Sequence, residues 1–168
     1  MKQPAQTKQS KIDFWSYSSF NAYLTNRSAF KDRYINKIYD STSSPSAVVG
    51  SAAHKALEAF YNEGLEPHEA KARGLEYIAG VSDYSIDYGK TGTRENMLTT
   101  YGRAIDFYFE ELPEYHEILG AEIAMTEEVQ TIYGDPLPLP MKGFADLITR
   151  NKLGQIEIID QKFTRVLS

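Results

Sequence analysis

Apolar side chains recur with a helical period along the first part of this 168-residue chain, and β-branched apolar runs follow in the later part. Over residues 94–112 the apolar positions lie three or four apart, as one face of a helix requires, and Pro113 ends the pattern. Further helices are predicted over residues 18–39 with a break near Asn26, 48–64 and 67–79. Strands are predicted over residues 118–133, 142–150 and 155–165. This order of elements indicates a mixed α/β (α+β) fold.

Length and composition indicate one domain. The 168 residues, 42% hydrophobic and 12% aromatic, can bury a core but are too few for two ordinary domains. We therefore expect a single domain over residues 1–168, with residues 1–12 as a polar tail.

No apolar stretch approaches the ~20 residues that span a bilayer, and residues 1–11 lack a hydrophobic signal region. The absence of cysteine excludes disulfides and thiolate zinc sites and is compatible with a reducing cytoplasm, where we expect the protein to act.

Two acidic side chains and a lysine fall on predicted neighbouring strands near the end of the sequence. Residues two apart on a strand share a face, so Asp160 and Lys162 are expected to point the same way. Between the strands, Asn151 and Gly154 are the residue types that a tight hairpin turn needs. The hairpin is expected to place Asp146 opposite Asp160.

This trio suits metal-dependent hydrolysis of a phosphate ester. Two carboxylates hold a hard divalent cation such as Mg²⁺ or Mn²⁺, which polarises the phosphoryl group and lowers the pKa of a bound water. A nearby ammonium group offsets the charge that builds on the phosphate in the transition state. Aspartate and lysine two apart on a strand are also common as a solvated charge pair, and these residues alone favour that simpler interpretation.

A histidine lies on the helix predicted over residues 48–64. Gly50 and Ser51 are expected to open this helix, with His54 near its first turn. Taken alone, His54 is expected to pair with Glu58, one turn further along the helix surface. Upstream, a serine-rich segment beginning at Trp15 leads into an aromatic helix.

Four short patterns, taken in order, resemble the RecB-like branch of the PD-(D/E)XK nuclease superfamily. They are the Ser-x-Ser-aromatic segment at Ser16, the Gly-x-x-x-His helix at Gly50, the Gly-x-x-Asp strand at Gly143 and the Asp-x-Lys strand at Asp160. The resemblance covers the chain from about Phe14 onward. It implies a restriction-endonuclease-like core with a helical N-terminal part packed on a mixed β-sheet, and a Mg- or Mn-dependent deoxyribonuclease.

The resemblance also implies roles for particular residues. The implied metal ligands are His54, Asp146, Asp160 and the backbone carbonyl of Gln161, and the implied catalytic residue beside the attacking water is Lys162. Relatives often carry a further glutamate on the strand before the Asp146 strand. Glu127 and Glu128 are the two candidates, and the sequence does not choose between them or exclude that either is simply solvated.

Two features depart from the pattern of the family. Without cysteine, the iron-sulfur cluster that clamps some relatives is excluded. After Lys162 the family continues with a helix and a strand, whereas this sequence has only residues 163–168, so we expect C-terminal core elements to be missing. A fragment of a longer nuclease, a natural truncation or completion by another chain would each explain this. The uncovered sheet face would then favour self-association or binding of a partner.

The expected partner is DNA, although the net charge of −5 is unusual for a nucleic-acid binder. Basic residues do cluster among aromatic ones after the first helix start, at Arg27, Lys31, Arg33 and Lys37. This segment is either a DNA-gripping patch or, as we favour, an amphipathic helix with a solvated rim.

The family leans toward exonucleases of recombination and repair, in bacterial or phage settings, often joined to a helicase. The alternatives are a catalytically inactive DNA-binding or assembly module and an unrelated α+β interaction domain.

Overall fold

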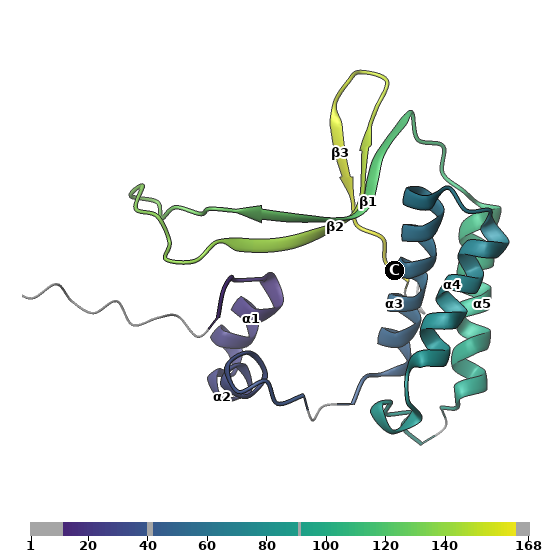
Figure 1. Ribbon diagram of the computed structural model, residues 1–168, viewed down its shortest axis with the longest axis horizontal. Helices are drawn as coiled ribbons and strands as arrows, with labels where there is room; N and C mark the ends of the chain where they lie inside the picture. Colours follow the sequence, from purple (N-terminus) through teal and green to yellow (C-terminus); the bar gives the residue numbers. More distant parts are fainter. Residues whose placement is uncertain (1–11, 40–41, 91, 164–168) are drawn as a thin grey trace, which may run out of the picture. The chain divides into compact units, whose positions relative to one another are not determined.

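The chain falls into two compact units. The computed structural model describes residues 12–39, 42–90 and 92–163. One unit consists of Met1–Asp40 with Ala124–Gly143, and the other of Ser41–Ile123 with Phe144–Ser168. Strands β1 (Glu117–Glu127) and β2 (Met141–Arg150) contribute residues to both units (Figure 1).

Short helices lie in the N-terminal part of the first unit that the structure describes. They are α1 (Tyr17–Thr25), α2 (Arg27–Phe30) and the π-helical turn η1 (Lys31–Ile35). Asn26 separates the first two, because its side-chain oxygen accepts a hydrogen bond from the backbone N–H of Ala29, 3.1 Å away, and so caps the new helix. The predicted break near Asn26 is therefore confirmed.

Aromatic rings pack these short helices together. The Trp15 ring stacks on Phe30 with centroids 5.6 Å apart, and Phe30 stacks in turn on Tyr34 at 5.3 Å. The Arg27 guanidinium lies 5.2 Å from the centroid of the Tyr23 ring. At least one cation of the basic segment thus covers an aromatic ring of its own unit.

The second unit is built mainly from helices. They are α3 (Pro45–Glu58), the π-helical turn η2 (Ala59–Glu63), α4 (Pro67–Gly80), the 3₁₀ turn η3 (Asp83–Ser85) and α5 (Arg94–Glu110). The prediction that the His54 helix opens at Gly50 and Ser51 is wrong. It begins at Pro45, because the Ser44 hydroxyl caps the N–H of Ala47 and proline suits the first helical position. His54 consequently lies well inside the helix.

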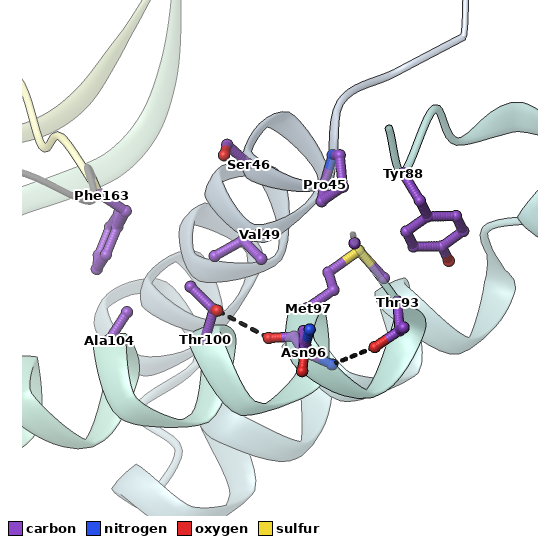
Figure 2. A pocket seen from close by; sticks show the side chains of 11 residues that line it. Pro45, Ser46, Val49, Tyr88, Thr93, Asn96, Met97, Thr100, Ala104 and Phe163 are labelled. Carbon is purple, nitrogen blue, oxygen red and sulfur yellow. Dashed lines mark hydrogen bonds between the residues drawn. The ribbon is translucent and has the colours of Figure 1, made fainter. Parts of the chain in front are cut away.

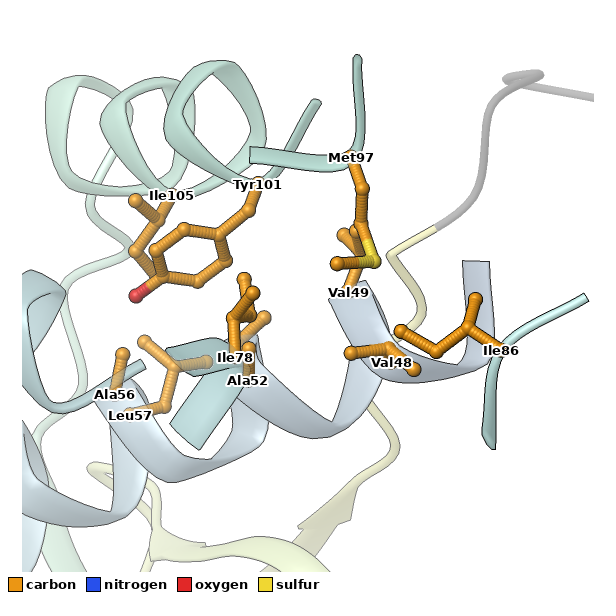
Figure 3. Close-up of a cluster of buried hydrophobic side chains, with 11 residues drawn as sticks. Val48, Val49, Ala52, Ala56, Leu57, Ile78, Ile86, Met97, Tyr101 and Ile105 are labelled. Carbon is orange, nitrogen blue, oxygen red and sulfur yellow. The ribbon is translucent and has the colours of Figure 1, made fainter. Parts of the chain in front are cut away.

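The core of the second unit lies between α3, α4 and α5, which pack side by side (Figures 1 and 3). Ala52, Ile78 and Tyr101 are fully buried there, one from each helix. Tyr101 fits because α4 carries Gly74 at the contact, where any side chain would overlap the Tyr101 hydroxyl. That hydroxyl donates a hydrogen bond to the carbonyl of Lys71, 2.8 Å away. These contacts join α4 to α5, and α3 packs against both helices.

The strands form one sheet in the order β1-β2-β3, with β3 spanning Ile156–Ile159. Strands β2 and β3 pair antiparallel, with Leu147 opposite Ile159. Asn151 closes the turn, since its backbone N–H donates to Gln155 and its side-chain oxygen accepts from the N–H groups of Leu153 and Gln155. Gly154 supplies the left-handed residue, with φ +78°. The predicted hairpin and the predicted α/β class are both confirmed.

Two strand boundaries differ from the prediction. Strand β3 ends at Ile159, so the segment from Asp160 to Lys162 follows the strand instead of belonging to it. Strand β1 ends at Glu127 and not near residue 133. Within the described part of the chain, no helix is both long enough and apolar enough to cross a bilayer.

Candidate metal centre

Three side chains from three elements of the second unit converge at one point. They are His54 of α3, Glu122 of β1 and Asp146 of β2, and one ligand atom of each lies within 4.8 Å of the other two. Nδ1 of His54 is 2.7 Å from Oε1 of Glu122 and 3.7 Å from Oδ1 of Asp146. The three side chains are 28%, 24% and 15% exposed in that order. They are partly withdrawn from water but still open to an incoming ion.

The donor set fits a divalent cation. Two carboxylate oxygens and one imidazole nitrogen are ligands that hard or borderline metals such as Mg²⁺ and Mn²⁺ accept. Two carboxylates held this close repel each other, and a cation between them removes that repulsion. An imidazole coordinates only through a ring nitrogen with a free lone pair, so a metal bound at Nδ1 of His54 would replace the hydrogen bond between His54 and Glu122.

The position of Asp146 follows from strand alternation. Ala145 and Leu147 are buried on one face of β2, so Asp146 projects from the other face. Its Oδ2 accepts a hydrogen bond from the backbone N–H of Gln161, 2.7 Å away, while Oδ1 faces His54. The backbone of Gln161 thus fixes Oδ2 of Asp146, and Oδ1 remains directed at His54.

The position of Glu122 follows from a break in the strand. Its φ is +52°, in the left-handed region that side chains other than glycine rarely adopt, and Gly120 just before it has φ +150°. The Asn62 side chain of η2 binds both backbone groups of Ala121, at 2.8 Å each. This part of β1 is therefore bent in a defined way, as in a β-bulge.

Sequence reasoning did not find Glu122. It pointed to Glu127 or Glu128, which lie in the first unit, whereas among the described residues the structure places Glu122 beside His54 and Asp146. One signal was available, because a glycine inside a strand pattern often marks a bulge, and Gly120 precedes Glu122 by two residues.

The structure places Asp160 and Lys162 in an ion pair of their own. Nζ of Lys162 donates to Oδ1 of Asp160 at 2.6 Å, and both side chains are largely exposed. This hydrogen bond raises the pKa of the Lys162 ammonium group. Asp160 is not a member of the three-residue cluster found among the described residues.

The segment that carries this pair is anchored on both sides of Lys162. The buried Gln161 side chain donates to the hydroxyl of Tyr108 on α5, 2.7 Å away, and that hydroxyl is 2.6 Å from the hydroxyl of Tyr61. Burial raises the pKa of Tyr108, so its hydroxyl stays neutral. The Phe163 ring packs edge-on against the His54 ring, with centroids 6.1 Å apart. Both anchors hold the Asp160–Lys162 segment close to the cluster.

A pocket of about 540 Å³ lies beside this anchored segment. Figure 2 shows Phe163 on its wall, together with Val49 of α3 and Met97, Thr100 and Ala104 of α5. A second pocket, of about 670 Å³, is lined by Lys162 and Phe163 and, on α5, by Arg103 and Phe107. The lysine of the Asp160–Lys162 pair therefore borders a surface with both apolar and basic groups.

Comparison with models of protein families gives a match. The family model described as the PD-(D/E)XK nuclease superfamily matches residues 14–167, which include all the residues of the cluster and of the anchored segment. No curated protein and no solved structure matches the chain.

Proposed function

Because the chain belongs to the PD-(D/E)XK nuclease superfamily, we propose that it hydrolyses phosphodiester bonds of DNA with a divalent metal held by His54, Glu122 and Asp146. The observation that carries this proposal is the convergence of these three side chains from distant parts of the sequence. Their donor atoms are the ones that Mg²⁺ or Mn²⁺ would use. We also propose Asp160 and the Gln161 carbonyl as further ligands, as the family resemblance implies.

The residues around the cluster have distinct proposed roles. Once bound, the metal would supply Lewis acidity toward the phosphoryl group and lower the pKa of water. The Gln161 N–H fixes one oxygen of Asp146, so that the other remains directed at the cluster. The Lys162 ammonium group offsets the negative charge on the reacting phosphate, and Asp160 holds that lysine in place.

For the wider role, we propose an exonuclease of the RecB-like branch that acts in recombination, repair or phage DNA processing, with a helicase as a candidate partner. The order of the four sequence patterns supports this proposal. Self-association through the sheet is a further proposal, supported by the exposed Ile156 and Ile158 side chains on one face of β3. A nuclease-like module without catalysis remains the rival, and the net charge of −5 favours it.

The decisive experiment measures metal binding and cleavage with the same protein. The full chain is titrated with Mn²⁺ by calorimetry and incubated with linear and circular DNA in Mg²⁺ or Mn²⁺, with and without a chelator. Glu122→Gln removes one proposed ligand charge, and Glu128→Gln is its control. We expect Glu122→Gln to weaken Mn²⁺ binding at least about tenfold and to lose cleavage, while Glu128→Gln behaves as wild type.

Each outcome separates the candidate functions. Cleavage of linear but not circular DNA supports an exonuclease. Mn²⁺ binding without cleavage of either DNA supports the non-catalytic module. If the wild type binds no Mn²⁺, or if cleavage persists in the chelator, the proposed metal-dependent nuclease is refuted.

A further inference from the structure

The carboxylate of Glu122 stands on a backbone that needs support. A positive φ in a residue with a side chain costs on the order of 1–3 kcal/mol, and the surrounding structure must impose it. Extended backbone would be the relaxed state for a residue inside a strand. Without an external restraint, Glu122 would be expected to relax and to carry its carboxylate away from His54.

Asn62 provides such a restraint on the preceding residue. Its side-chain oxygen accepts from the N–H of Ala121, and its amide donates to the carbonyl of Ala121, each at 2.8 Å. The Ala121 carbonyl belongs to the peptide plane that leads into Glu122, and φ of Glu122 measures the rotation from that plane. Fixing both polar groups of Ala121 therefore fixes the plane against which the left-handed turn is made.

The π-helical turn η2 explains how Asn62 reaches this strand. His54 and Asn62 belong to one continuous helical segment, and they contact the adjacent residues Glu122 and Ala121 of β1. Eight residues of α-helix would leave their side chains about 80° apart around the axis. A π turn accommodates about one extra residue, which reduces the offset to roughly 20°. The turn thereby puts the ligand and the restraint on the same face.

We propose that Asn62 is a positioning residue for the metal centre. Its side chain holds the Ala121–Glu122 backbone so that the Glu122 carboxylate meets His54 and Asp146. This inference rests on the proposed metal site and adds a residue that supplies no ligand atom. The Asn62 residue is itself exposed, so its truncation opens no cavity in the core. A variant at this position is therefore expected to fold.

The test is the affinity for Mn²⁺ of the full chain, measured by calorimetry well below the melting temperature. Asn62→Ala is expected to raise Kd about tenfold, the usual size of effect for residues that orient metal ligands. The control is Tyr101→Phe, which removes one side-chain hydrogen bond to a backbone carbonyl where Asn62→Ala removes two to backbone groups, and which lies in the helical core. It should lower the melting temperature without changing Kd. Asn62→Ser, too short to reach both groups of Ala121, should behave as Asn62→Ala.

A double variant tests whether Asn62 acts through Glu122. In a Glu122→Gln background, Asn62→Ala should add less than about a twofold change in Kd, because the charge it positions is already gone. An equal rise in both backgrounds overturns the proposal, and so does a single-variant Kd within about twofold of wild type. These outcomes presuppose that the wild type binds Mn²⁺. A wild type that binds none refutes the proposed function instead.

Discussion

The left-handed backbone at Glu122 can be tested by comparing two substitutions at the same position. Glu122→Ala and Glu122→Gly both remove the carboxylate and its hydrogen bond to His54, so that loss cancels in the comparison. Alanine keeps the Cβ that makes φ +52° unfavourable, at about 1–2 kcal/mol, whereas glycine does not. Glycine also loses about 0.5–1 kcal/mol more backbone entropy on folding. The difference leaves Glu122→Gly more stable than Glu122→Ala by about 0.5–1 kcal/mol.

Thermal unfolding followed by circular dichroism measures this difference. For a chain of this size 1 kcal/mol corresponds to about 2–4 °C, so the glycine variant should melt roughly 1–4 °C above the alanine variant. Glu157 of β3 is the control, because it lies in a regular strand opposite Thr149. There the alanine variant should melt higher by a similar amount, since only the entropy of glycine remains. The same order of melting temperatures at both positions would refute the strained backbone at Glu122.

Three further predictions concern other parts of the second unit. Tyr108→Phe removes the acceptor of the buried Gln161 amide and should destabilise the protein by about 1–3 kcal/mol in urea unfolding, and an unchanged midpoint would contradict the anchor. Lys162→Met should abolish DNA cleavage yet leave Mn²⁺ affinity within about twofold of wild type, because the lysine offsets charge without ligating metal. The pKa of Asp83 is held below its ordinary 3.8 by the Tyr88 hydroxyl and by Arg94, so its stabilising contribution is present at neutral pH and lost as pH falls through the lowered pKa. The difference in melting temperature between wild type and Asp83→Asn should therefore vanish in strong acid, and a difference that persists would contradict this assignment.

Local patterns predicted much of the fold. The helical period located α4 and α5 closely, because both helices bury one face against a shared core. The Asn151 and Gly154 turn fixed the register of the hairpin, which pairs Leu147 with Ile159. The ladder ends there, so the expected position of Asp160 opposite Asp146 stays a prediction. In the structure His54 and Asp146, both of them sequence-based candidates, lie together.

The end of β3 could not be predicted from a local pattern. Three isoleucines at positions 156, 158 and 159 and a phenylalanine at 163 make the run from Ile156 to Phe163 look like a buried strand. The chain leaves the strand after Ile159, and Gln161 is held by partners outside the backbone ladder of β2 and β3. Its N–H binds the Asp146 carboxylate and its side chain binds Tyr108. Such contacts lie 15 and 53 residues away in sequence, beyond the reach of any window pattern.

Contacts between residues distant in the sequence also explain why sequence analysis did not find Glu122 and proposed Glu127 and Glu128 instead. A period of two assigns side chains to faces only while every residue of the strand is extended. At Glu122 the backbone turns left-handed, so counting along β1 no longer tells where the side chain points. Its direction depends on Asn62, which binds Ala121 from 59 residues away. A glycine within a predicted strand, as at Gly120, is therefore the place where an acidic residue that breaks the alternation should be considered as a ligand.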